Sequence, residues 1–435
     1  MVRVHPRSPH KTFPPYPFRL IPLNPSLSRV SCPVMFSQRT QWNFTPNRFT
    51  EVHREMLRQG REILDLTLSN PTRAELPFDG EAILSSLAHP AALDYDPQAK
   101  GLATARESVA DYYADYYARY CAQYHTQPPA TPLVSPESIL LTTSTSEAYS
   151  YVFRLLCNPG DEVLVPKPSY PLFDFLADLQ DVKLVPFPLL YDHGWQIDFP
   201  SLHKSVTERT RAVVLVNPNN PTGSYVRGPE RSAMNDFCRQ HGLALIVDEV
   251  FLDYSLDTHP QATFATNQQN LTFTLSGISK ISALPQMKLA WLVASGPYAL
   301  VQPALERLEV IADTYLSMNA PIQYATPTLL HQRLSIQPQL LARVRANLEE
   351  LDRQLAHQRH CERLIVEGGW YAVLRVPVTQ TDEELAIRLL LEASVLVHPG
   401  HFYDFQSDGH LILSLIVPPE TFRTAIARIL QILSQ

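Results

Sequence analysis

A lysine between two apolar runs is the residue of this chain best suited to covalent chemistry. Lys280 follows the β-rich run 271–275 and precedes a second run at 289–293, so we expect it on a loop at the end of a strand. A lysine in a cleft can lose its proton and form a Schiff base with a carbonyl cofactor. Most lysines are solvated surface charges, however, so this hypothesis depends on the elements that would place other groups beside Lys280.

Four further apolar runs are predicted to be strands that end in polar loops. They cover 138–141, 162–165, 211–216 and 243–247, and Ser, Thr, Asn, Asp or Lys follows each of them closely. Helical patterns lie between them, including a long one over 102–124 that is rich in Ala and Tyr. This alternation is typical of an α/β domain, and in open α/β sheets the ligand crevice lies at the carboxyl ends of the strands. We therefore expect the polar loops and the lysine at one edge of a sheet.

The first of these loops has two interpretations. Ser144-x-x-Glu147 has the spacing of a capping box, which stabilises a helix N-terminus and needs no ligand. Free amides and hydroxyls at a helix N-terminus that follows a strand also form a phosphate site. The two interpretations are physically compatible, so the capping box does not exclude a phosphate ligand.

The composition limits the classes of function. The chain has 435 residues, of which 45% are hydrophobic and 18% charged, as in a globular protein of two or three packed units. Its net charge of −7 gives no reason to expect nucleic acid or a membrane as partner, and no apolar stretch approaches the roughly 18 residues of a membrane span. The five cysteines stand singly without a C-x-x-C spacing, which favours reduced thiols in a cytoplasmic protein over disulfides or a metal site.

Four segments are predicted along the chain. Residues 1–34 contain eight prolines and five Lys or Arg but no acid, so we expect a disordered basic extension and no signal peptide. Residues 35–75 are predicted to be an N-terminal segment that packs with a small C-terminal domain. The large domain with the ligand crevice is expected over 76–309. A helical stretch to about residue 358, followed by strands and two further helices over 382–393 and 419–433, predicts a small α+β domain over 310–435.

Several motifs follow one another along the chain. They are Pro159-Gly160-Asp161-Glu162-Val163, Asn217-Pro218-Asn219-Asn220-Pro221-Thr222-Gly223, Val247-Asp248-Glu249-Val250 and the loop of Lys280. In this order they resemble the fold-type I pyridoxal-phosphate enzymes, specifically the class I and II aminotransferases, over about residues 50–435. The resemblance implies an α/β fold with a large, mostly parallel sheet flanked by helices, a small α+β domain, and pyridoxal 5'-phosphate as the cofactor.

The resemblance also implies a role for each residue of the crevice. Lys280 would form the Schiff base with the cofactor and later move a proton between the substrate and cofactor carbons. Asp248 would pair with the pyridine nitrogen, Asn220 would donate to the ring oxygen, and Tyr170 would stack on the ring. Without the resemblance, Asn220 belongs to a plain Asn-Pro turn and Tyr170 is an ordinary exposed aromatic.

Five residues match the phosphate site of the family. Ser144, Thr145 and Ser146 match the turn whose backbone amides supply most of the binding, and Lys288 stands at the position of a cationic ligand. Tyr95 matches a tyrosine that the family offers to the phosphate of the neighbouring subunit. The resemblance thus implies a homodimer, with simple packing as the alternative role for Tyr95.

Four positions depart from the family pattern. Gly277 replaces a hydroxyl residue and Lys288 replaces an arginine, and both changes weaken the grip on the phosphate. Phe251 replaces a tyrosine that helps to polarise the ring oxygen. Ile412 replaces an arginine that binds the α-carboxylate of the substrate. Another group must therefore hold that carboxylate, or the substrate lacks it.

Candidate substrate contacts are fewer and less specific. Ser69 and Asn70 follow a strand predicted over 62–68 and are expected near the substrate. Arg375, on a small-domain strand, is a candidate to replace the missing arginine, with a solvated strand edge as its alternative. The imidazoles of His398 and His401, in a loop that should approach the crevice, are weaker substitutes.

These residues favour an aminotransferase, which moves an amino group between an amino acid or amine donor and a keto acceptor. A carbon–sulfur β-lyase, a decarboxylase or a racemase would use the same cofactor, and the sequence does not separate them. The changes at Phe251 and Ile412 also suggest a non-catalytic homologue or a regulator. The retained Lys280, Asp248 and Asn220 argue against decay, and the proline-broken tail cannot supply a helix-turn-helix for a regulator.

Overall fold

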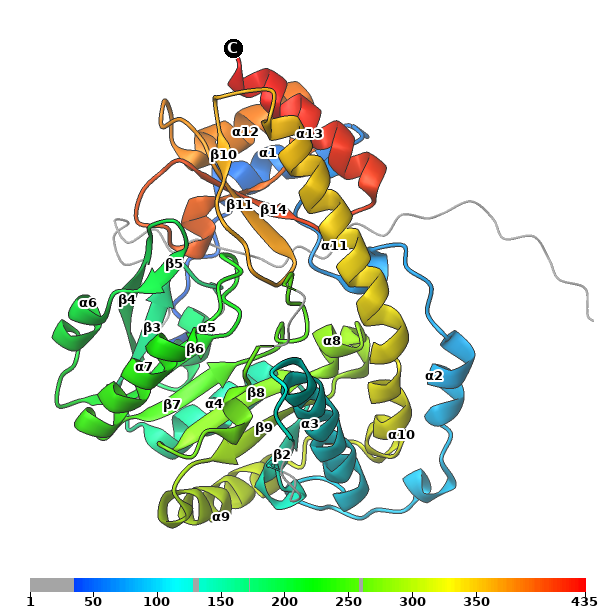
Figure 1. The fold of residues 1–435 in the computed structure, drawn as a ribbon, viewed down its shortest axis with the longest axis vertical. Coiled ribbons are helices and arrows are strands. Elements are labelled where there is room, and N and C mark those ends of the chain that lie inside the picture. The colour runs from blue at the N-terminus through cyan, green and yellow to red at the C-terminus, as the bar shows by residue number, and fades with distance from the viewer. Residues whose placement is uncertain (1–34, 128–132, 172, 258–260) are drawn as a thin grey trace, which may run out of the picture.

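The computed structural model describes residues 35–127, 133–171, 173–257 and 261–435. The extension predicted over 1–34 lies outside the described residues. Figure 1 shows a large sheet in the lower half of the molecule and a small sheet above it, with helices around both. The chain is an α/β protein, as the sequence predicts.

The large sheet has eight strands in the order β2-β9-β8-β7-β6-β3-β4-β5. Its centre, from β8 through β7, β6 and β3 to β4, is parallel, whereas β9 runs antiparallel to both of its neighbours and β5 runs antiparallel to β4. The strands are β2 Ile139–Thr142, β3 Glu162–Lys167, β4 Lys183–Tyr191, β5 Trp195–Ile197, β6 Thr210–Val216, β7 Ala244–Asp248, β8 Thr272–Gly277 and β9 Ala290–Ser295.

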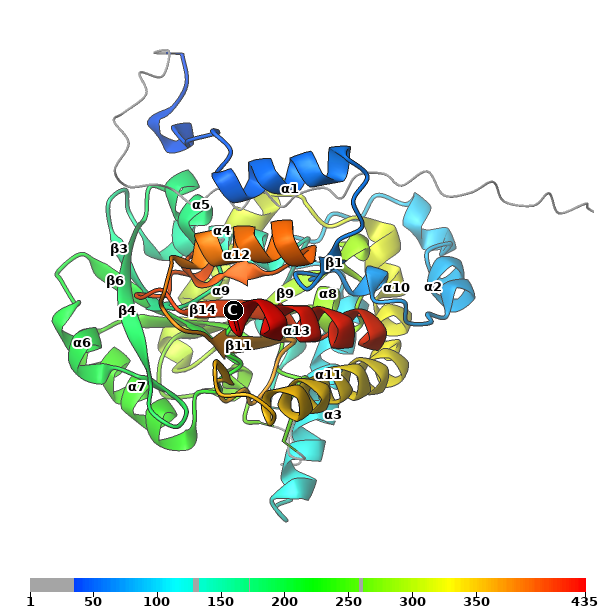
Figure 2. The same cartoon turned by 90° about the horizontal axis from the view of Figure 1, so that it is seen from above.

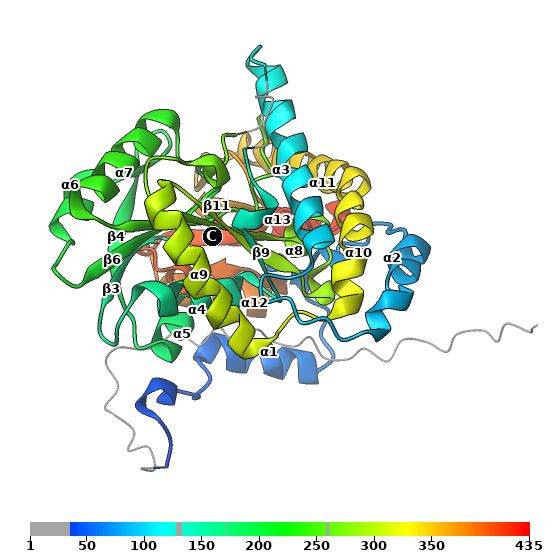
Figure 3. The same cartoon turned by 90° about the horizontal axis from the view of Figure 1, so that it is seen from below.

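Helices cover both faces of this sheet, and alternate residues of one strand show it. On β6, Val214 and Val216 join the apolar core with α4 and α9, whereas Val213 and Leu215 pack with α7. Figure 3 shows α3 beside α10, and both pack against β2 and β9. Strands buried on both faces need apolar residues throughout, so polar side chains are left to the strand ends. The helices are α2 Gly80–Ser86, α3 Ala103–Gln123, α4 Thr145–Leu156, α5 Phe173–Leu179, α6 Phe199–Lys204, α7 Gly228–His241, α8 Ile278–Ile281, α9 Tyr298–Tyr315 and α10 Ala320–His331.

The small sheet is antiparallel, in the order β10-β11-β14-β13, and a separate parallel pair joins β1 to β12. Its helices are near neighbours in Figure 2, where α1 lies beside α12 and α12 beside α13. Helix α11 contacts α10 at one end of the molecule and α13 and β10 at the other, so it links the two sheets. The elements are α1 Arg48–Arg58, α11 Arg333–Leu355, α12 Asp382–Ala393, α13 Pro419–Leu433, β1 Leu64–Asp65, β10 Glu362–Arg363, β11 Tyr371–Arg375, β12 Val395–Leu396, β13 His398–Pro399 and β14 His410–Ser414.

Short 3-10 helices occupy several connections: η1 Gln38–Thr40, η2 Pro71–Arg73, η3 Pro90–Leu93, η4 Pro136–Ser138, η5 Phe264–Thr266, η6 Pro285–Met287 and η7 Gly400–Tyr403. Among the described residues, no helix is both long enough and apolar enough to cross a membrane.

The N-terminal segment over 35–75 divides its contacts between the two sheets. Helix α1 packs on α12, and the ring of Phe49 lies 5.6 Å from that of Phe402. The preceding η1 instead lies against α5, where Arg39 forms an ion pair with Asp181. The sequence predicts that this segment packs with the small domain, and the contact of η1 with α5 is an additional one.

Two local expectations are wrong. Lys280 does not lie on a loop, because residues 278–281 form the short helix α8 directly after β8. The strand expected over 62–68 is shorter and has only the two residues of β1. The helical stretch predicted to about residue 358 is confirmed as the three helices α9, α10 and α11.

Candidate active site

Strand register brings the predicted residues to one edge of the large sheet. Gly277 at the end of β8 and Thr142 at the end of β2 both pair with Ala290, the first residue of β9. Asp248, the last residue of β7, pairs with Val216 on one side, directly before the Asn217 loop, and with the β8 residue Leu275 on the other. The loops with Ser144, Asn220 and Asp248, and helix α8 with Lys280, therefore follow neighbouring strand ends.

Lys280 is held at both its backbone and its amine. Its carbonyl accepts a hydrogen bond of 2.7 Å from the Tyr254 hydroxyl, and its Nζ donates to the Ser69 carbonyl at 3.2 Å. Burial lowers the pKa of Lys280 to about 8, because the charged amine loses water, and the nearby Asp248 opposes this effect. A substantial fraction of the amine is thus unprotonated, as a nucleophile requires, slightly above neutral pH.

Asp248 has few partners for a carboxylate in so enclosed a place. Its Oδ1 accepts from the Val250 amide at 3.1 Å, and its Oδ2 accepts a long bond of 3.4 Å from the hydroxyl of Tyr149 on α4. Burial raises the pKa of Asp248 to about 6, and these two hydrogen bonds and Lys280 offset only part of that effect. A cationic partner would therefore be bound strongly by this carboxylate.

Among the described residues of the asparagine loop, the Nδ2 of Asn219 and the Oδ1 of Asn220 are buried without a hydrogen-bond partner. Asn217 Oδ1 accepts from the Val226 amide at 3.0 Å, and Asn219 Oδ1 accepts from the Thr222 hydroxyl at 2.9 Å, so both side chains shape the loop. Asn220 is 9% exposed, and its Oδ1 has no hydrogen-bond partner in the described part of the chain. A buried acceptor oxygen without a partner costs free energy, so it fits a bound hydrogen-bond donor.

The turn before α4 is both a helix cap and a possible anion site. Ser144 Oγ accepts from the Glu147 amide at 3.2 Å, as the capping box predicts. The Glu147 carboxylate accepts from the Thr143 amide at 2.7 Å, one residue earlier than a standard box. Thr145 and Ser146 occupy the first two helical positions, where amides have no intrahelical acceptor. An anion can use these amides without disturbing the cap.

Lys288 and Gly277 adjoin this turn through the start of β9. Lys288 is exposed, with a left-handed backbone (φ 53°), and stands two residues before Ala290. Gly277 has a steric reason to lack a side chain: a Cβ there would lie 2.8 Å from Ala290 Cβ and 2.9 Å from the Leu289 carbonyl oxygen. The missing hydroxyl thus reflects close packing of β8 on β9.

The two predicted tyrosines differ in position. Tyr170 is half-buried after β3, and burial followed by the charge of Asp248 raises its pKa, so its phenol lies near that carboxylate. Tyr95, by contrast, is 81% exposed before α3. The structure of one chain does not bring Tyr95 to Lys280.

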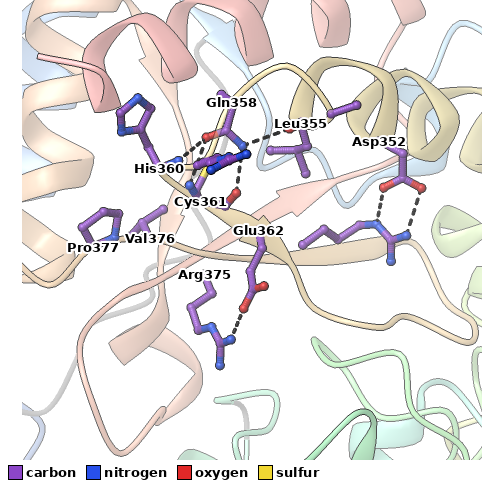
Figure 4. Close-up of a pocket in the computed structure, with 12 residues that line it drawn as sticks. Asp352, Leu355, Gln358, His360, Cys361, Glu362, Arg375, Val376 and Pro377 are labelled. Carbon is purple, nitrogen blue, oxygen red and sulfur yellow. Dashed lines mark hydrogen bonds and ion pairs between the residues drawn. The ribbon is translucent and has the colours of Figure 1, made fainter.

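The candidate substrate contacts separate into two groups. Ser69 meets Lys280 through its carbonyl, and Asn70 caps η2 by accepting from the Thr72 amide at 3.1 Å. Arg375 is not brought to Lys280. It forms an ion pair with Glu362 in a pocket at the end of α11, which shares no lining residue with the lysine site (Figure 4).

Position 412, where the family has an arginine, is buried in the small sheet. Ile412 is 1% exposed and pairs with Val373 and His398 in the small sheet. The Nδ1 of His398 lies 3.1 Å from the Tyr403 hydroxyl, and burial lowers the pKa of His398 to about 4, so its imidazole is neutral at physiological pH. Burial also lowers the pKa of His401. Neither histidine supplies a cation in place of an arginine.

Sequence reasoning missed three residues around Lys280 and Asp248. Tyr149, Tyr254 and Trp370 all contact one of these two residues. Tyr149 lies on the predicted helix after the Ser144 turn, so its position one helical turn inside that helix was a usable signal. Trp370 lies 90 residues from Lys280 in sequence, and no local pattern indicated their contact.

Comparison with known proteins places this chain in a family. The family model described as "Aminotransferase class I and II" matches residues 75–429. The chain belongs to this aminotransferase family.

Curated relatives of the aminotransferase include an alanine aminotransferase of Mycobacterium tuberculosis, 28% identical over 386 residues, or 85% of this chain and 85% of that protein. Glutamate-pyruvate aminotransferase AlaA of Haemophilus influenzae is 26% identical over 404 residues, covering 88% of this chain and 94% of that protein. An alanine aminotransferase structure from Pyrococcus furiosus aligns with a TM-score of 0.78 at 20% identity, over 92% of this chain and 99% of that one, which shows the fold.

Proposed function

We propose that this member of the family is a pyridoxal-phosphate-dependent aminotransferase. The observation that supports it best is the pairing of a desolvated amine, Lys280, with a desolvated carboxylate, Asp248. Each of these groups lacks the partner that its chemistry favours. One ligand with an aldehyde and a basic ring nitrogen satisfies both.

The residues present fit this cofactor. Lys280 would hold its aldehyde covalently, Asp248 would keep the ring nitrogen protonated, and Asn220 would donate to the ring oxygen. Tyr170 would lie against the ring. Pyridoxal phosphate, when bound, supplies the electron sink through which an amino group leaves one carbon skeleton and joins another. Freed from the cofactor, the Lys280 amine can move the proton at the substrate carbon.

The phosphate would be held by the turn before α4. The amides of Thr145 and Ser146 and the hydroxyl of Ser144 lie at the N-terminus of α4, and a helix N-terminus favours an anion. Lys288 would add a point charge without the planar fork of an arginine. We further propose that the protein is a cytoplasmic homodimer in which Tyr95 reaches the phosphate of the neighbouring subunit.

For substrates, we propose an amino acid donor and a keto acid acceptor, with pyruvate as the first acceptor to test. The relatives named as glutamate-pyruvate and arginine-pyruvate transaminases, and those named for alanine, share this acceptor or its product. Their identities below 30% leave the donor open.

The test begins with the purified protein and added pyridoxal phosphate. We expect borohydride to attach the cofactor irreversibly to Lys280, as located by peptide mass spectrometry, with none attached in Lys280→Ala. A panel of amino acids with pyruvate should then yield alanine. Release of ammonia and pyruvate from a cysteine conjugate without any acceptor would instead identify a β-lyase, and absence of trapping at Lys280 would refute the proposal.

A further inference from the structure

Three aromatic rings surround Lys280. Its Nζ lies 4.9 Å from the ring centroid of Trp370 and 5.4 Å from that of Phe251. Trp370 contacts Phe251 edge to face at 5.2 Å and Tyr254 at 4.9 Å. Trp370 and Tyr254 are fully buried, and Phe251 is 4% exposed. We name Phe251, Tyr254 and Trp370 the aromatic clamp.

The clamp acts on a lysine whose two ends are already fixed. The Tyr254 hydroxyl holds the Lys280 carbonyl, and the Ser69 carbonyl accepts from Nζ. The amine therefore has one defined position, and the ring faces of Phe251 and Trp370 lie beside it. A ring face attracts an ammonium group and at the same time keeps water away from it.

Trp370 reaches the lysine from the small-domain side, yet its segment is fastened to the large domain. In the segment 366–370, the Glu367 amide donates to the Gly223 carbonyl at 3.2 Å, and the Glu367 carbonyl accepts from the Leu256 amide at 2.8 Å. These bonds tie the segment to the loops that follow β6 and β7. The position of Trp370 is thus set by the same part of the large domain that contains the site.

The phenylalanine at position 251 gains an explanation from this arrangement. Phenylalanine leaves a ring without a polar group, with its centroid 5.4 Å from the Lys280 Nζ. The charged side chain that also acts on Lys280 is Asp248, on β7. Its pKa of about 6 means that it is ionised throughout the range in which Lys280 titrates.

We propose that Trp370 and Phe251 are positioning residues that hold the free, protonated amine of Lys280 against the Ser69 carbonyl. They keep the amine directed into the crevice whenever it is not joined to the cofactor. The benefit of this arrangement rests on the proposed function, because only a cofactor-binding lysine needs it. The contact of the rings with the amine can be tested in the cofactor-free protein.

The test measures the titration of Lys280 in cofactor-free protein. Samples are treated with formaldehyde and cyanoborohydride over a pH series, and methylation of the Lys280 peptide is quantified by mass spectrometry. We expect half-maximal methylation of the wild type at about pH 8. Trp370→Leu still excludes water but has no ring face to stabilise the ammonium, so its midpoint should fall by about 0.5–1 pH unit. Trp370→Phe keeps a ring and should stay near the wild type.

A second variant and a control keep the outcome interpretable. Phe251→Leu should shift the midpoint in the same direction. It replaces Trp370→Leu if thermal unfolding shows that Trp370→Leu is not folded. Tyr298→Leu changes a tyrosine that is 77% exposed on α9 and should leave the midpoint unchanged. Coincident profiles for wild type and both leucine variants would overturn the proposal. A normal shift in a protein that transfers no amino group would overturn only the proposed function.

Discussion

At the residue scale, Glu249 makes stability depend on pH. This carboxylate, next to Asp248, is 1% exposed and accepts from the Thr263 hydroxyl at 2.6 Å and the Phe264 amide at 2.7 Å. Burial raises its pKa from 4.5 to about 7. Between these values the folded protein binds a proton that the unfolded chain has released, so the contribution of Glu249 to stability is lost as pH rises through this window. The loss amounts to about 3 kcal/mol.

We therefore expect Glu249→Gln to lose less stability than the wild type between pH 5 and pH 8, because a neutral amide carries no buried charge and its single oxygen can still accept from the Phe264 amide. Denaturant unfolding at the two pH values measures the difference. Glu107→Gln, at an exposed glutamate of α3, serves as the matched control. Equal losses in the wild type and Glu249→Gln would contradict the assignment.

The same residues show what sequence can and cannot predict about the site. Asp248 and Lys280 were predictable because each closes or follows an apolar run, and the runs must be neighbouring strands. The clamp was not, because Trp370 contacts Lys280 across 90 residues and two sheets. The role of Arg375 was open for the same reason: only its pairing with Glu362 across β10 and β11 shows where it lies.

At the element scale, the close packing of β8 on β9 predicts the effect of restoring a hydroxyl. In Gly277→Ser, the new Cβ would meet Ala290 and the Leu289 carbonyl at under 3 Å, so the start of β9 must move. We expect a loss of about 1–3 kcal/mol in stability, as for other overpacked positions, and weaker cofactor binding because Lys288 shifts with β9. Thermal unfolding and a cofactor titration measure the two effects.

The control is Gly228→Ser at the start of α7, where a Cβ would meet nothing within 4 Å. It should leave both quantities unchanged. Tighter cofactor binding in Gly277→Ser, with stability intact, would show that the site has room for the hydroxyl after all.

Helices and strands were predictable where the sequence pattern matches the way the element is buried in the fold. The helices α12 and α13 have the predicted bounds because their apolar periodicity and N-terminal signals coincide. Strand β4 was not predicted, since Pro186 and Pro188 interrupt its pattern. Both prolines precede 189–191, the part of β4 that pairs with β5, so they lie where the strand has β3 as its partner but not β5. Helix α8, with four residues, is too short to show any period.

At the scale of the whole molecule, one surface carries apolar side chains that a monomer leaves in water. Leu84 on α2, Leu93 on η3 and the neighbouring Tyr95 are 66%, 92% and 81% exposed. Both α2 and η3 pack against α10, and apolar exposure on neighbouring elements is typical of a surface covered by a partner. The loop with Leu93 and Tyr95 leads into α3, which contributes to the core under the site. A second subunit on this surface would thus lie near the active site of the first.

We expect the wild type to be a dimer by light scattering and Leu93→Asp to be a monomer at the same concentration, because the partner surface would have to bury an unpaired charge. Val378→Asp, at a residue that is 67% exposed on the small domain, should remain a dimer. Tyr95→Phe separates assembly from binding: it should leave the dimer intact while weakening cofactor binding severalfold, since only the hydroxyl to the phosphate is lost. If the wild type is a monomer and binds the cofactor as tightly as Leu93→Asp does, Tyr95 has no part in the site. The phosphate would then be bound by the turn before α4 and Lys288 alone.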